Sequence, residues 1–181
     1  MYETLAKQGT KSAGTGLAGI DSSKLKKLRN NQLRECFNLI DEMRHKLEFV
    51  ARIKGVSYVD DAASRTVFST WYALETLEGE AVWIANGLDA DRYRTSGFNM
   101  LRSMVELKVK CIVCVGSSDG YRSAFGDVVG DIVSVQSVPE AVAVASKKAT
   151  ENMKVLFSPA VENGVSYEEQ GDLFKRGVNE L

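Results

Sequence analysis

The stretch CIVCV at 111–115 is an unbroken apolar run, the pattern of a strand buried on both faces of a sheet. Three more strand-like runs occur at 81–85 (AVWIA), 132–135 (IVSV) and 155–157 (VLF). Segments with helical spacing flank these runs, at about 65–77, 97–107, 121–125, 139–150 and 168–181. Strands alternating with helices predict an α/β fold, a Rossmann-like and mainly parallel sheet with helices on both faces.

A β-hairpin is predicted to open this sheet. Residues 47–53 and 56–59 form two short runs around Lys54-Gly55, a dipeptide that favours a tight turn. These two strands bring the predicted sheet to six.

The N-terminal part of the chain has a different composition. Residues 1–20 are rich in Gly, Thr, Ser and Lys, which predicts a flexible arm. Residues 21–44 place apolar side chains at helical spacing with basic residues on the other faces, which predicts a helical extension. The α/β domain is therefore expected to span 45–181.

Composition narrows the function classes. The 181 residues include 23 Lys and Arg against 24 Asp and Glu, a net charge of −1, which makes a nucleic-acid partner unlikely. Three cysteines fit a reducing compartment. No apolar run approaches the ~20 residues that cross a bilayer. We expect a cytoplasmic protein without membrane contact.

Two motifs that suggest chemistry have simpler interpretations. Cys111 and Cys114 form a CxxC, but residues three apart on a strand point to opposite faces, so core packing is favoured over redox chemistry. His45 is the only histidine and lies at the junction between the helical extension and the hairpin, which favours a structural role. Neither motif therefore provides a catalytic group or a metal ligand.

Polar residues follow the predicted strands, at the sheet edge where parallel sheets bind ligands. Asp60 and Asp61 fit a metal or ribose site and equally fit a helix N-cap. The segment 116–120 (GSSDG) fits an anion cradle or a plain turn.

These strand-end segments, in this order, resemble the C-terminal domain of the Mur ligases, most closely the D-glutamate-adding (MurD) members. The resemblance runs from about Asn30 to Leu181. The segments that carry it are Leu33-Arg34-Glu35, His45-Lys46-Leu47-Glu48-Phe49-Val50, Gly55-Val56, Asp61, Ser69-Thr70-Trp71-Tyr72-Ala73-Leu74, Val82-Trp83-Ile84-Ala85, Gly87, Asp89, Ser158-Pro159-Ala160 and Tyr167-Glu168 with Gly171-Asp172-Leu173-Phe174. The resemblance implies ancestry in ATP-dependent ligation of D-glutamate to a peptidoglycan precursor.

The same resemblance implies a degenerate substrate site. Ala63 replaces a family lysine, Arg65 a threonine that positions D-glutamate, and Ala90 a lysine that pairs with the amino-acid carboxylate. Glu162, in the segment after Pro159, adds a negative charge. The positions that the family uses for its substrate are here Ala63, Arg65, Thr66, Ala90, Ser158, Val161 and Asn163. Losing several charged partners of a dianion, at about 2–5 kcal/mol each, predicts that D-glutamate recognition is lost.

The nucleotide-facing positions are less altered. By resemblance, Asp61 reaches the nucleoside, and Lys46 replaces an arginine near the phosphates while keeping its charge. Weak binding of ATP or ADP with Mg²⁺ is the cofactor prediction that follows.

We therefore expect a stand-alone Mur-ligase C-terminal-like domain that acts by binding without catalysis. A protein partner is expected to dock on the N-terminal arm and helix. Two alternatives stay open: a fragment or split subunit of a MurD-type ligase, and a weak nucleotide sensor.

Overall fold

The computed structural model describes residues 44–93 and 97–181. The chain divides into two units, Met1–Leu39 and Ile40–Leu181, and every described residue lies in the second. The predicted flexible arm (1–20) and nearly all of the helical extension (21–44) therefore lie outside the described residues.

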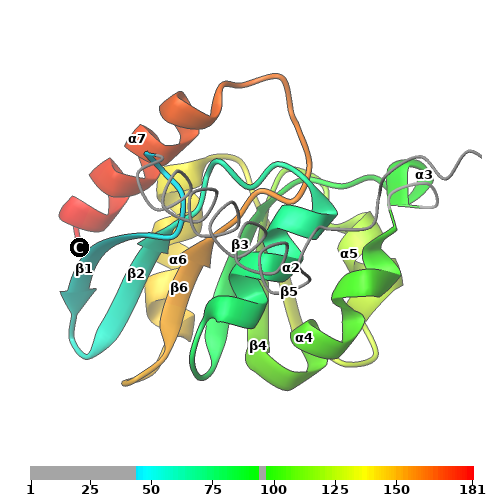
Figure 1. The fold of residues 1–181 in the computed structure, drawn as a ribbon, viewed down its shortest axis with the longest axis horizontal. Coiled ribbons are helices and arrows are strands. Elements are labelled where there is room, and N and C mark those ends of the chain that lie inside the picture. Colours follow the sequence, from blue (N-terminus) through cyan, green and yellow to red (C-terminus); the bar gives the residue numbers. More distant parts are fainter. Residues whose placement is uncertain (1–43, 94–96) are drawn as a thin grey trace, which may run out of the picture. The chain divides into compact units, whose positions relative to one another are not determined.

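A six-stranded sheet forms the centre of the second unit (Figure 1). Its strands are β1 (Glu48–Ile53), β2 (Val56–Asp60), β3 (Ala81–Asn86), β4 (Val109–Val115), β5 (Asp131–Val135) and β6 (Lys154–Phe157). They lie in the order β1-β2-β6-β3-β4-β5. The β1–β2 pair is antiparallel and every other pair is parallel, which confirms the predicted mainly parallel sheet opened by a hairpin.

Helices cover both faces of the sheet, as predicted. The elements whose buried side chains join one core cluster are α2 (Val67–Thr76), the 3-10 helix η1 (Phe98–Leu101), α4 (Arg102–Lys108) and α5 (Asp119–Phe125). The opposite face packs on α6 (Val138–Lys148) and α7 (Tyr167–Asn179). The short helix α3 (Ala90–Tyr93) has no buried residue and was not predicted.

Helix starts follow the local sequence. Ser137 caps α6 by accepting from the backbone N–H of Glu140, and Pro139 occupies the first turn, as expected. Thr66 and Ser69 form a reciprocal capping box at the start of α2. Because Thr66 is the cap, the interpretation of Asp60 and Asp61 as N-caps of this helix is wrong.

The two thiols of the CxxC diverge, as predicted. Cys114 packs in the cluster under α2, α4 and α5, and Cys111 packs in the cluster under α6 and α7. Burial raises the pKa of Cys111 to about 11 and that of Cys114 to about 12, so both stay protonated and unreactive at neutral pH.

None of the helices in the two described ranges is long and apolar enough to cross a membrane.

Candidate functional site

The strand order brings three chain segments to one edge of the sheet. Because β6 pairs with both β2 and β3, the ends of these strands place Asp60 and Asp61, Ser158, and Asn86 at neighbouring positions. The loops that follow are tied together: the N–H of Ala160 donates to the carbonyl of Ser64 at 3.0 Å. The predicted strand-end residues are therefore gathered in space.

Asp61 faces inward and is fully buried. One carboxylate oxygen accepts from Lys46 Nζ at 2.8 Å, and the other accepts from the Ser158 hydroxyl at 2.8 Å. The Ser158 hydroxyl also hydrogen-bonds to that of Thr70, on α2, at 2.8 Å. Burial raises the pKa of Asp61, and the Lys46 charge works against that rise. The two predicted nucleotide residues thus contact each other, and Ser158 from the predicted substrate set joins them.

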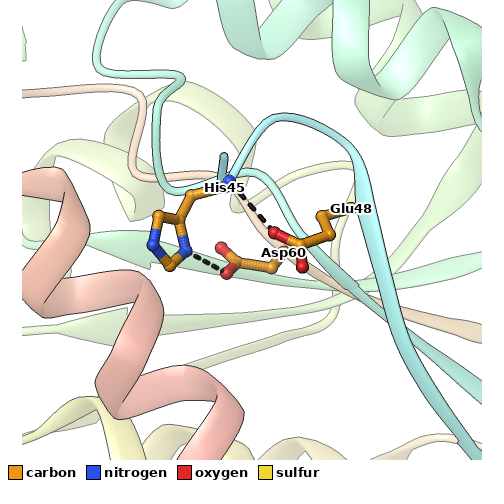
Figure 2. A group of neighbouring side chains, drawn as sticks. All are labelled: His45, Glu48 and Asp60. Atoms are coloured by element: carbon orange, nitrogen blue, oxygen red, sulfur yellow. Dashed lines mark hydrogen bonds and ion pairs between the residues drawn. The ribbon is translucent and has the colours of Figure 1, made fainter. Parts of the chain in front are cut away.

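A second buried pair lies beside the first. His45 Nδ1 lies 2.6 Å from Asp60 Oδ2, and neither side chain has exposed surface (Figure 2). Glu48 accepts from the backbone N–H of His45 at 3.1 Å, and Lys175 on α7 donates to both Glu48 oxygens at 2.8 Å. Desolvation raises the pKa of Asp60, while its hydrogen bond to His45 opposes the rise. Asp60 and Glu48 thus hold both the side chain and the backbone of His45.

Gly171 of α7 makes room for the imidazole. A Cβ at this position would lie 2.0 Å from His45 Nδ1. His45 and Leu47 both adopt left-handed backbone conformations, with φ of 61° and 49°. Such conformations are costly for residues with a Cβ, so the buried contacts of His45 and Lys46 must hold this turn in place. We call His45, Lys46, Glu48, Asp60, Asp61, Ser158 and Lys175 the inner network.

By donor type, part of the inner network could hold a divalent cation. His45, Glu48 and Asp60 each offer a ligand atom, and these atoms lie within 4.8 Å of one another. The ammonium of Lys175, however, lies 2.8 Å from Glu48 and 3.9 Å from Asp60. Because this cation already balances the two carboxylates, the arrangement favours a partly buried ion-pair cluster over a metal centre.

An open cleft of about 540 Å³ lies outside the inner network. We call it the outer cleft; its lining includes Arg65, Thr66, Phe68, Arg92, Met100, Val161 and Glu162. Arg65 Nη2 and Glu162 Oε1 form an ion pair at 3.0 Å, and Arg92 donates to the Glu162 carbonyl at 3.2 Å. An internal carboxylate therefore sits against the cationic side of the cleft.

The predicted substrate positions divide between these regions. Arg65, Thr66 and Val161 line the outer cleft, whereas Ser158 is buried in the inner network. Ala63, Ala90 and Asn163 are not among the lining residues; Asn163 instead accepts from the N–H of Val165 at 3.1 Å.

The sequence did not predict several residues that the structure places in the inner network or the outer cleft. Phe68, Arg92 and Met100 have no motif that would reveal them. Gly171 lies in a segment of the resemblance, which was its only signal. The GSSDG turn lies close to the loop after β3: a Cβ on Gly87 would lie 2.7 Å from the Ser117 nitrogen.

Comparison with known proteins agrees with the resemblance. No protein-family model matches the chain. The UDP-N-acetylmuramoylalanine--D-glutamate ligase of Christiangramia forsetii is 35% identical over 98% of this chain and 40% of that protein. The ligase of the same name from Porphyromonas gingivalis is 30% identical over 99% of this chain and 40% of its own length. Among solved structures, MurF ligase from Thermotoga maritima in complex with ADP superposes with a TM-score of 0.49 at 14% identity, over 76% of this chain and 32% of that one.

The matches extend further than the resemblance predicted. Coverage of 98–99% of this chain includes most of the residues before Asn30, so the expected starting point of the resemblance is wrong. The chain spans about 40% of the length of these relatives. MurD-type ligases match nearly the whole length of this chain, which carries a MurD-like Mur ligase C-terminal domain.

Proposed function

We propose that this chain is a binding module of the MurD type that neither takes D-glutamate nor catalyses ligation by itself. The observation that carries the proposal is the Arg65–Glu162 ion pair in the outer cleft. It joins two positions at which this sequence departs from the family pattern.

The charges of the outer cleft disfavour D-glutamate. The ligand carries two carboxylates, and Glu162 adds a third carboxylate to the same space. Ala63 and Ala90 supply no cation where the family pattern has lysines. Arg65 faces Glu162 at 3.0 Å, so a dianion that displaced Glu162 from it would still leave its own second carboxylate and that of Glu162 in the same space.

The inner network supports only weak nucleotide binding. A nucleotide that used Asp61 would have to replace its bonds to Lys46 and Ser158, both 2.8 Å long. Separating a buried pair leaves a charge without its partner, at a cost of about 3–5 kcal/mol. We therefore propose that ATP or ADP with Mg²⁺ binds weakly or not at all.

The test is titration of the full chain with D-glutamate and, separately, with Mg-ATP and Mg-ADP in a calorimeter. We expect no heat of binding for D-glutamate. The variant Ala63→Lys/Arg65→Thr/Ala90→Lys/Glu162→Ala restores the family pattern and should gain affinity. Glu80→Ala, which breaks an exposed Lys110–Glu80 ion pair of 2.9 Å, is the matched control. Specific D-glutamate binding by the unmodified chain would overturn the proposal.

A split subunit of a ligase is the second candidate. It is favoured by the match to MurD-type ligases over 98–99% of this chain, which includes most of the first 29 residues. It predicts that adding the rest of a MurD-type ligase in trans restores ATP turnover with UDP-N-acetylmuramoyl-alanine and D-glutamate. A binding module predicts no turnover in the same mixture.

The partner of a binding module would be a protein that contacts the predicted arm and helical extension, residues 1–44. Reversing the charges of Lys24, Lys26 and Lys27 in the full chain should weaken binding to such a partner. Unchanged affinity would remove these residues from the proposal.

A further inference from the structure

The outer cleft combines cationic groups with exposed apolar side chains. Arg65 and Arg92 line it together with Phe68 and Met100, whose side chains are 66% and 51% exposed. Large apolar side chains that face solvent beside charged groups are typical of ligand-binding surfaces. The volume of about 540 Å³ falls within the usual range of small-molecule sites, about 300–1,000 Å³.

Glu162 lies where an anionic ligand would be held. Its carboxylate accepts from Arg65 Nη2 at 3.0 Å, and its backbone carbonyl accepts from Arg92 Nη2 at 3.2 Å. Guanidinium groups recognise carboxylates through such N–H donors. The chain thus supplies its own carboxylate to the site.

This internal contact is easily replaced. The side chains of Arg65 and Glu162 are 35% and 64% exposed, and exposed ion pairs contribute little to stability. Arg65 therefore loses little when it exchanges the Glu162 carboxylate for the carboxylate of a ligand. The inner network offers no such exchange, because Asp61 is fully buried.

The apolar wall restricts the rest of the ligand. Phe68 stacks on Trp71 with ring centroids 6.1 Å apart, which fixes an aromatic surface beside the cleft. An apolar group of a ligand that covers Phe68 and Met100 removes their exposed surface from water. A second carboxylate on the ligand would instead meet Glu162.

We propose that the outer cleft binds a monocarboxylate with an apolar body, that Arg65 holds its carboxylate, and that Glu162 competes with it from within the chain. The proposal goes beyond the loss of D-glutamate binding and does not depend on it.

The probe is N-acetylphenylalanine, which joins one carboxylate to an apolar ring. Its binding to the full chain is measured by NMR titration, with N-acetylphenylalanine amide and D-glutamate as comparison ligands. We expect the carboxylate probe to bind and the amide to bind much more weakly. Amide binding equal to that of the acid would overturn the proposal, because it would show apolar adsorption only. Tighter binding of D-glutamate than of the probe would contradict both the proposed function and the preference for a monocarboxylate. Equal binding of acid and amide without D-glutamate binding would overturn this proposal alone, so the two failures are distinguishable.

Variants assign the roles of the charges. Glu162→Gln removes the internal competitor and should tighten probe binding by up to about fivefold, the upper limit that corresponds to exposed ion-pair strengths. Arg65→Gln should abolish the preference for the acid over the amide. Glu80→Gln alters an equally exposed ion pair elsewhere and should leave the affinity unchanged. Probe affinity that does not respond to either Glu162→Gln or Arg65→Gln would overturn the proposal.

Discussion

The inner network and the outer cleft lie next to each other at the same edge of the sheet, yet their charges are in opposite environments. Asp60, Asp61 and His45 have no exposed surface, whereas Arg65 and Glu162 are 35% and 64% exposed. In the inner network each buried carboxylate has several partners. In the outer cleft the ion pair is one contact between two side chains that water reaches.

This difference indicates where a substitution can change what the chain binds without destabilising its fold. A substitution that separates Asp61 from Lys46, or Asp60 from His45, leaves a buried group without its partner, which destabilises the whole domain. A substitution in the outer cleft alters recognition and leaves the fold intact. The departures from the family pattern at Arg65 and Glu162 fall in the second class.

The largest effect is expected from Lys46→Ala. It leaves Asp61 buried without its ammonium partner and should lower the free energy of unfolding by about 3–5 kcal/mol. Urea denaturation followed by circular dichroism measures the change. Lys46→Met/Asp61→Asn, which removes both charges, should recover most of the loss. If the double variant were as unstable as the single one, the stabilising role of the charge pair would be disproved.

Gly171→Ala should have the next largest effect. Its Cβ would lie 2.0 Å from His45 Nδ1, and His45 is fully buried against Asp60. The imidazole or α7 must shift, so we expect a loss of about 1–3 kcal/mol or more, as in overpacked cores. Gly130→Ala is the control, because a Cβ there meets nothing within 4 Å. Equal melting temperatures for the two variants would show that the close contact is not restrictive.

The Glu48–Lys175 ion pair should make stability depend on pH. The hydrogen bond that Lys175 donates to Glu48 holds the pKa of Glu48 below the ordinary value of 4.5. A carboxyl group with a lowered pKa stabilises the folded state above about pH 4.5, and this contribution is lost as the pH falls through the lowered value. The melting-temperature difference between wild type and Glu48→Gln should therefore shrink below that pH.

A second variant checks the cause of this pH dependence. In a Lys175→Met background the largest cause of the lowered Glu48 pKa is gone, and the weaker bond from the His45 N–H still lowers it. The stability change caused by Glu48→Gln should therefore differ less between pH 3 and pH 7 than it does in the wild-type background. A difference of undiminished size would assign the effect to another group.

The sequence indicated which segments form strands but not which strands lie side by side in the sheet. Apolar runs such as 81–85 and 111–115 identify buried strands because burial on both faces leaves no room for polar residues. The position of β6 between β2 and β3 depends on pairing between distant segments, which no local pattern records. The short helix Ala90–Tyr93 was missed because four residues show no periodicity.

The same limit applies to the candidate site. Resemblance pointed to Lys46 and Asp61, but their mutual pairing depends on the left-handed turn at His45 and Leu47, which the sequence does not reveal. Arg65 and Glu162 were noted separately as departures from the family pattern. Their contact exists because β6 lies beside β2, and it is therefore a property of the strand order.

The smallest effect is expected from Glu162→Ala, and it separates the two regions most sharply. Because the ion pair with Arg65 is exposed, its loss should change the free energy of unfolding by about 0–1 kcal/mol. Urea denaturation under the conditions used for Lys46→Ala allows a direct comparison, and the same protein can be titrated with N-acetylphenylalanine. A loss near that of Lys46→Ala would mean that Glu162 stabilises the fold, and the outer cleft could not then change its ligand without cost. A small loss together with tighter probe binding would mean that this carboxylate serves recognition, so that the buried network preserves the domain while the exposed pair determines what the cleft accepts.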